Sequence, residues 1–476
     1  MGEAFVRLLG RTTSGHRLIP EIDGLRFFAI ASVILFHANI QACRLLNPGI
    51  SDADMAQELG ARLPTSILAR GEVGVPVFFA LSGFILGMPF AKFRRGLGSG
   101  VNLRSYFERR ISRLEVPFLV ALLAALVAVI ASRAEVGIGH LIASATYLHQ
   151  LIYGTRSTIN PVSWSLEIEV QFYCLAPLLA IAFAARSSVA RMLAIASMMV
   201  PSIVMYVFFD EQLANQHLNQ TILGYAFYFL TGFMALELFL SGAFDSPRGK
   251  GWTYDVIGVA AVVALLWPGE ISRLSRTLMF PPACIALFAS AFRGRAFNAF
   301  FTSPAVVVTG GMCYSIYLLH YGIMILAARV LGPSLLAVVG PANVAWATTL
   351  LFVTIVPISI LPCVLFFVAV EKPCMRRGWH VEALDACRNA VSTLEVGFRR
   401  AIAAYAPERP VTPISAVPVT NSGQWDLSLE RRVFRMHWVE QRDFESIAAA
   451  CGITVFQARF AAMRATINTQ AALRAM

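Results

Sequence analysis

The sequence predicts an all-α fold: a polytopic membrane bundle of about ten transmembrane helices, followed by a small cytoplasmic helical module. The first observation is composition, because the 476 residues are 57% hydrophobic and only 14% charged, with a mean hydropathy of +0.64. The second is that apolar runs near membrane-spanning length recur from residue 24 to residue 370. Ordinary soluble domains do not have this profile, so soluble classes are excluded for this part of the chain.

The expected spans follow the apolar runs in order. They are 24–43, 72–90, 115–132, 163–183, 191–209, 219–240, 253–268, 277–292, 303–328 and 343–369. The first run follows a basic segment and lacks a small-residue cleavage site, so we interpret it as a retained helix and not as a signal peptide.

Arginine and lysine residues indicate how the spans are oriented in the membrane, because they are concentrated in every second segment that connects two spans. They are Arg7, Arg11 and Arg17; Lys92, Arg94, Arg95, Arg104, Arg109, Arg110 and Arg113; Arg186 and Arg191; Arg248 and Lys250; Arg293 and Arg295; and Lys372, Arg376 and Arg377. The other connections are poorer in cations. The positive-inside rule then predicts a multi-pass membrane protein with both termini cytoplasmic. The net charge of +11 reflects this asymmetry and contact with anionic lipid more than nucleic acid.

Cysteine spacing and a change in composition indicate how the chain is divided into parts. The eight cysteines include no C-x-x-C pair, so the sequence indicates neither a disulfide framework nor a metal site. After Pro373 the composition changes. The predicted parts are a cytoplasmic N-terminal segment (1–17), a membrane domain (18–374), an amphipathic helix (375–405), a breaker-rich linker (406–426) and a helical tail (427–476).

The first span carries an arginine at its mouth and a histidine in its middle, in "IDGLRFFAIASVILFH". Arg26 and His37 are eleven positions apart, close to three helical turns, so they share a face and lie roughly 16 Å apart along the axis. A titratable group at membrane depth costs about 2.5–3.5 kcal/mol, which makes each one a functional candidate. The alternative is a neutral His37 bonded to a neighbouring carbonyl.

The fourth span opens with "PVSWSLEIEVQFYCLAP", which places Glu169 about 9 Å into the helix from the outer side. Glu169 and His37 can therefore meet near mid-depth, where a carboxylate would orient the imidazole and raise its basicity. The alternative places Glu167 and Glu169 in a solvated outer turn, with Trp164 and Tyr173 as interfacial belt residues.

Two further segments concern helix packing and phosphate binding. In "GEVGVPVFFALSGF" small residues permit close helix approach, and Ser82 is either a nucleophile or, with better support, a packing residue. In "YFERRISRLEVPF" Arg110 and Arg113 share a face at i, i+3, and arginine forks suit phosphate oxygens, although positive-inside topology alone would also explain the cluster. In "GGMCYSIYLLH" His320 either contacts substrate or makes a structural hydrogen bond.

Taken together in order, these segments resemble the acyltransferase-3 family of integral membrane O-acyltransferases, which in bacteria modify surface polysaccharides. The resemblance covers about residues 18–374. Its elements are "RFFAIASVILFH" (Arg-x10-His), "GVPVFFALSGF", "RRISRLEVPF", "WSLEIEVQFY", "YSIYLLH" and "EKP". The fourth element puts the family glutamate at Glu169 and not at Glu167. Pro76 departs from the pattern, because many members carry aspartate there, and no hydrolase domain follows the last span, so any such partner would be another protein.

The resemblance implies an acyl-CoA donor, usually acetyl-CoA, used as a co-substrate with no permanently bound cofactor. Arg26, Arg110 and Arg113 would hold the donor phosphates at the inner mouth. His37 would act as general base, oriented by Glu169, on a hydroxyl of a carbohydrate or glycoconjugate acceptor. The acceptor side would comprise Trp164, Ser82 and His320.

The tail contains "ERRVFRMHWVEQRDFESIAAACGITVFQARFAAMRA", which resembles the helix-turn-helix of sigma-factor region four. In such modules Ala448 packs the helix crossing, Gly452 turns the chain and Arg459 projects from the recognition helix. Protein docking or stabilisation is favoured over nucleic-acid binding by residues 427–476, because a duplex would have to be recruited to the membrane.

Two other function classes stay open. About ten spans with His, Arg and Glu near the midplane would suit a proton-coupled transporter of a small or lipid-linked substrate. A membrane-tethered regulator, in which the tail is the working part, would not need His37.

Overall fold

The protein is a helical bundle with a separate small helical unit, and the predicted all-α fold class is confirmed. The computed structural model describes residues 9–11, 18–61, 65–133, 135–209, 220–245, 250–339, 344–375, 427–455, 458–459, 461–462 and 465. Among these residues no strand forms, and one isolated bridge joins Gly251 to Gly294.

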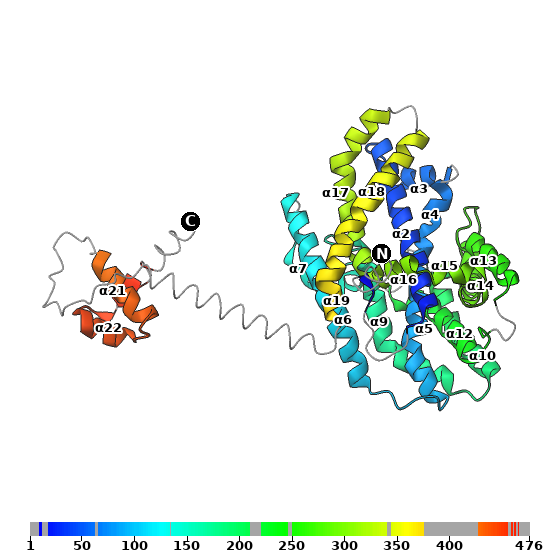
Figure 1. Ribbon diagram of the computed structural model, residues 1–476, viewed down its shortest axis with the longest axis horizontal. Helices are drawn as coiled ribbons and strands as arrows, with labels where there is room; N and C mark the ends of the chain where they lie inside the picture. The colour runs from blue at the N-terminus through cyan, green and yellow to red at the C-terminus, as the bar shows by residue number, and fades with distance from the viewer. Residues whose placement is uncertain are drawn as a thin grey trace. The chain divides into compact units, whose positions relative to one another are not determined.

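The helices of the membrane unit follow one another closely in the chain (Figure 1). The first half contains α2 (Pro20–Leu46), α3 (Asp52–Ala61), α4 (Thr65–Ala69), η1 (Arg70–Val73), α5 (Gly74–Arg94), α6 (Leu103–Ala131), α7 (Ile138–Ala145), α8 (His149–Tyr153), η2 (Pro161–Ser163), α9 (Trp164–Leu179) and η3 (Ala180–Ala184). The second half contains α10 (Ser188–Phe208), α12 (Ile222–Leu240), α13 (Trp252–Leu265), α14 (Arg273–Arg293), α15 (Ala296–Phe301), α16 (Pro304–Gly311), α17 (Cys313–Val339), α18 (Val344–Phe366), the π-helical turn η4 (Phe367–Glu371) and α19 (Lys372–Cys374).

Nine helical stretches within the described residues are long and apolar enough to cross a membrane, against about ten predicted. The difference is the run expected at 253–268, which forms α13 with only 14 residues. A helix of that length rises roughly 21 Å, less than the roughly 30 Å hydrocarbon core.

The span expected at 303–328 is also different, because two helices share it. The short α16 ends at Gly311, and α17 starts at Cys313 and continues to Val339. The break follows from packing: α16 lies against α2, and a Cβ at Gly310 would be 1.8 Å from the carbonyl oxygen of Asp23. Only glycine permits this approach.

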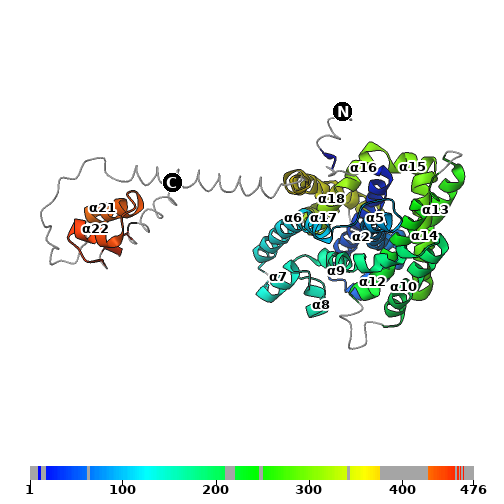
Figure 2. The same ribbon diagram turned by 90° about the horizontal axis from the view of Figure 1, so that it is seen from below.

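Helix α2 lies in the middle of the bundle, with α5, α16, α17 and α18 packed against it (Figure 2). The predicted close approach at the small residues of 71–84 is confirmed. A Cβ at Gly71 or Gly74 would lie 2.3 or 2.2 Å from carbonyl oxygens of α2. The glycines thus bring α5 directly against the helix that carries His37.

The C-terminal residues form a second compact unit, Gly378–Met476, separate from Met1–Arg377. It contains α21 (Leu427–Trp438) and α22 (Phe444–Cys451). In this unit Ala448 is buried, Gly452 is left-handed with a φ of 65°, and Arg459 is exposed, while the predicted helix-turn-helix stays a prediction. The amphipathic helix and the linker predicted for 375–405 and 406–426 lie outside the described residues, apart from residue 375.

Candidate active site

His37 faces a second histidine across the α2–α17 interface. The Nδ1 atom of His37 lies 2.9 Å from Nε2 of His320. His37 is half-buried, with its ring 4.7 Å from that of Tyr321, whereas His320 is fully buried. The span therefore holds a half-buried histidine that is hydrogen-bonded to a fully buried one.

The hydrogen-bond network fixes the tautomer of both rings. Nδ1 of His320 lies 2.9 Å from the carbonyl oxygens of Ile316 and Tyr317, and a carbonyl only accepts, so this nitrogen carries the proton. Nε2 of neutral His320 is then an acceptor, and the Nδ1–H of His37 donates to it. This leaves Nε2 of His37 unprotonated, which is the state a general base requires.

Two predicted roles change as a result. Glu169 is not the hydrogen-bond partner found at His37 Nδ1, because it accepts a 2.7 Å hydrogen bond from the Ser82 hydroxyl instead. Both ring nitrogens of His320 lie within hydrogen-bonding distance of protein atoms, which favours the structural hydrogen bond over contact with substrate. Sequence spacing places Glu169 inside a span but could not decide which polar side chain it bonds, because that partner, Ser82, lies 87 residues away in the chain.

The outer-turn alternative is wrong for Glu167, whose carboxylate is buried and accepts a 2.8 Å hydrogen bond from the backbone N–H of Gln150. Trp164 is half-buried and packs edge-on against Phe79, with ring centroids 6.3 Å apart. The exposed Arg156 lies over the Trp164 ring at 5.5 Å and is within electrostatic range of His37. Arg156 thus links Trp164 electrostatically to the neighbourhood of His37.

Arginines cluster at the Pro20 end of α2. Asp23 forms ion pairs with Arg26 at 2.8 Å and with Arg11 at 3.0 Å. Burial, followed by repulsion from Arg26, lowers the pKa of Arg11 to about 10, so it remains a cation at neutral pH. Arg113 on α6 is within electrostatic range of both Arg26 and Arg110. The three predicted donor-site arginines therefore lie in one electrostatic neighbourhood.

This neighbourhood also contains Glu371, in the π-helical turn η4. Its carboxylate is buried, accepts a 3.0 Å hydrogen bond from the backbone N–H of Ser315 and also bonds the Ser315 hydroxyl. Glu371 offsets part of the charge of Arg113, yet Nε of Arg113 is buried without a hydrogen-bond partner among the described residues. π-Helical turns occur frequently at functional sites.

Sequence reasoning missed four residues of this site: Arg11, Asp23, Arg156 and Glu371. Asp23 and Glu371 had a usable signal, because each is an acidic residue at the end of an apolar run, in "IDGLR" and "VEKP". Arg11 and Arg156 had none, since they come from connections that only the fold brings to the site.

Comparison with known proteins agrees with the motifs. The sequence profile of the acyltransferase-3 family, described as "Acyltransferase domain", matches residues 19–368. Putative peptidoglycan O-acetyltransferase YrhL of Bacillus subtilis is 30% identical over 205 residues, which are 40% of this chain and 28% of that protein. O-acetyltransferase OatA of Staphylococcus aureus is 23% identical over 345 residues, 65% of this chain and 51% of OatA.

The chain thus spans about half or less of the length of these relatives, and no solved structure matches it. The profile match covers every site residue from Asp23 to His320. It also covers most of the membrane unit, from α2 into η4. The chain belongs to the acyltransferase-3 family.

Proposed function

We propose that the protein is a membrane O-acetyltransferase that moves an acyl group, usually acetyl, from acyl-CoA to a hydroxyl of a carbohydrate acceptor. The observation that carries the proposal is the His37–His320 hydrogen bond, which leaves Nε2 of a half-buried His37 as a base inside a span. The names of the relatives, O-acetyltransferases, support the same reaction class.

The donor would bind at the arginine cluster. Arg26, Arg110 and Arg113 offer guanidinium forks that match phosphate oxygens, and the unpartnered Nε of Arg113 would gain an acceptor there. His37 is eleven residues further along α2 than Arg26, roughly 16 Å, so the pantetheine arm would carry the thioester from the phosphates to the base.

The chemical step would be direct transfer. Nε2 of His37 takes the proton of the acceptor hydroxyl as its oxygen attacks the thioester carbonyl carbon. The carbon–sulfur bond then breaks, and the thiolate leaves with the proton from His37. His320 is a positioning residue that holds His37 in the required tautomer, a role comparable to that of the third member of a catalytic triad.

The acceptor would approach past Trp164 and Arg156. An indole face suits the apolar face of a sugar ring, and Trp164 lies beside Arg156, which is within electrostatic range of His37. Since the arginine cluster lies at the Pro20 end of α2, a cytoplasmic donor requires the N-terminus to be cytoplasmic. The positive-inside pattern supports that orientation in a bacterial inner membrane.

The test uses purified full-length protein in detergent with acetyl-CoA and a panel of glycan acceptors. We expect wild type to release free CoA and form base-labile esters, and His37→Ala to lose about 10²–10⁴-fold in rate with unchanged expression. Esters formed equally by His37→Ala would overturn the assignment of the base. An intact thioester in every reaction would favour the transporter alternative, because a carrier does not consume it.

A further inference from the structure

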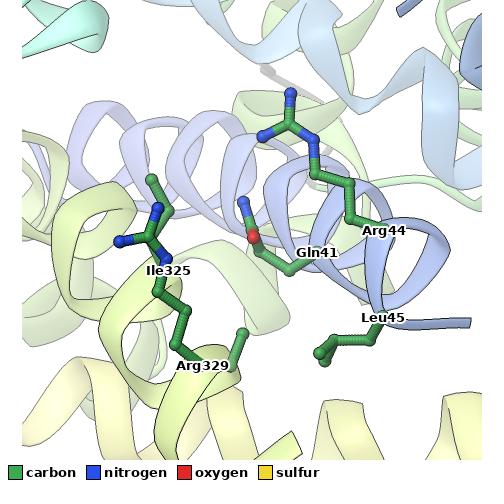
Figure 3. Close-up of a pocket in the computed structure, with 6 residues that line it drawn as sticks. Gln41, Arg44, Leu45, Ile325 and Arg329 are labelled. Atoms are coloured by element: carbon green, nitrogen blue, oxygen red, sulfur yellow. The ribbon is translucent and has the colours of Figure 1, made fainter. Parts of the chain in front are cut away.

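A cavity lies between α2 and α17, beyond the histidine pair. It has a volume of about 190 Å³ and is lined by Gln41, Arg44, Leu45, Ile325, Ala328 and Arg329 (Figure 3). Gln41 and Arg44 follow His37 by four and seven residues, so they share its helix face roughly 6 and 10 Å further along. The cavity is therefore separate from the arginine cluster at the other end of α2.

The polar side chains among the described lining residues are two guanidinium groups and one amide, with no carboxylate among them. Arg44 and Arg329 come from facing helices, and Gln41 lies between their side chains (Figure 3). Gln41 is 5% exposed, and its amide nitrogen has no hydrogen-bond partner among the described residues. A buried donor left without an acceptor destabilises the protein, and an anionic oxygen in the cavity would supply that acceptor.

The remaining lining is apolar, formed by Leu45, Ile325 and Ala328. The neighbouring side chains Leu326 and Val330 on α17 are 62% and 63% exposed, as expected of residues that face lipid. The volume is below the roughly 300–1,000 Å³ of pockets that enclose a whole drug-sized ligand. It therefore suits one charged group whose hydrocarbon chain continues along the outside of the bundle.

Arginines at the ends of spans commonly reach to the membrane interface without binding anything in particular. Two features set this pair apart. Arg44 and Arg329 border one cavity, and the unsatisfied amide of the buried Gln41 lines that same cavity. Interfacial placement alone explains neither the cavity nor the amide.

We propose that the cavity between α2 and α17 binds the phosphate group of a lipid. The phosphate would accept hydrogen bonds from Arg44, Arg329 and Gln41, and the lipid chain would lie along Leu326 and Val330. The inference rests on this lining and does not depend on the proposed acetyl transfer. The same chemistry would accept a phospholipid, a glycan linked to a lipid phosphate, or free phosphate.

The test is native mass spectrometry of the full-length protein released from detergent, with three probes: phosphatidic acid, diacylglycerol with the same acyl chains, and inorganic phosphate. We expect wild type to retain phosphatidic acid but not diacylglycerol. Arg44→Gln/Arg329→Gln should reduce phosphatidic acid occupancy about tenfold or more, as loss of charge-assisted hydrogen bonds predicts. Arg133→Gln, at an exposed arginine after α6, is the matched control and should bind as wild type does.

A second variant keeps Arg44 and Arg329 and fills the cavity. Ile325→Trp fills the cavity and should lower phosphatidic acid occupancy as much as the double arginine variant. Displacement of phosphatidic acid by inorganic phosphate would support the site and show that it also accepts free phosphate. Retention of phosphatidic acid in the presence of inorganic phosphate would support the site and show that the bound phosphate group belongs to a lipid. Equal occupancy in wild type and both variants, or equal retention of diacylglycerol, would overturn the proposal. Because the readout is binding, it is independent of any failure of acetyl transfer.

Discussion

At the scale of single residues, the hydrogen bond between His37 and His320 decides which nitrogen is available for chemistry. Two backbone carbonyls fix the proton on Nδ1 of His320, and this in turn fixes the proton on Nδ1 of His37. A lone histidine in a span would have no such constraint. His320 therefore holds the His37 ring in the orientation for which the sequence predicts Glu169.

Substitutions at His320 test this positioning role. His320→Leu removes the acceptor for the His37 Nδ1–H, so we expect the turnover rate to fall about tenfold or more while the KM for acetyl-CoA changes little. His320→Gln keeps a side-chain oxygen that accepts this hydrogen bond and should retain more activity. Steady-state kinetics of CoA release would measure both, and equal losses in the two variants would contradict the tautomer argument.

Binding of the acyl-CoA phosphates by the arginines can be tested separately from the chemical step. Arg113→Gln should raise the KM for acetyl-CoA about tenfold, since a charge-assisted hydrogen bond contributes about 1.5–3 kcal/mol. With acetyl-pantetheine, which lacks the nucleotide phosphates, wild type and Arg113→Gln should be alike. A variant that is equally impaired with both donors would show that Arg113 maintains the fold and does not bind phosphate.

At the scale of elements, glycines set the distances between helices. At the α5–α12 crossing, a Cβ at Gly83 would lie 2.0 Å from the carbonyl oxygen of Phe229, and one at Gly232 would lie 1.9 Å from that of Ala80. Because backbone atoms fill both positions, neither helix can accommodate a side chain by changing a rotamer. This close contact holds α5, and with it Ser82, at a fixed distance from the rest of the bundle.

Gly83→Ala should therefore destabilise the protein by about 1–3 kcal/mol or more, as overpacking does. Gly322→Ala is the control within α17, because a Cβ there meets nothing within 4 Å. It should be neutral or stabilising by up to about 1 kcal/mol, since alanine is the better helix former. Thermal unfolding of the purified variants in detergent measures the difference, and equal melting temperatures would refute the packing argument.

At the scale of the whole molecule, every residue assigned to the site lies between Arg11 and Glu371, inside the first compact unit. The C-terminal unit buries its own small core, which includes Val433, Ile447 and Ala448. We interpret the tail as an independent module.

Truncation after Arg377 should leave acetyl-CoA turnover within about twofold of the full chain, because it removes the second unit and no site residue. The measurement is CoA release at matched amounts of folded protein. A loss of turnover without a loss of folded protein would assign the tail a role in the reaction. Nucleic-acid binding stays a separate prediction, and a gel shift of residues 420–476 with no salt-dependent binding would remove it.

The sequence by itself determined the membrane fold, the order of most spans, the family and the presence of His37 and Arg26 on one face of the first span. These features follow from local composition, helical periodicity and ordered motifs, which do not require knowledge of neighbours. The partner of His37 and the break before Cys313 were decided only by the tertiary structure. The physical reason is that hydrogen bonds and close backbone approaches join residues far apart in the chain, as His37 and His320 are. Several polar side chains could form each hydrogen bond, and only the folded arrangement selects one of them.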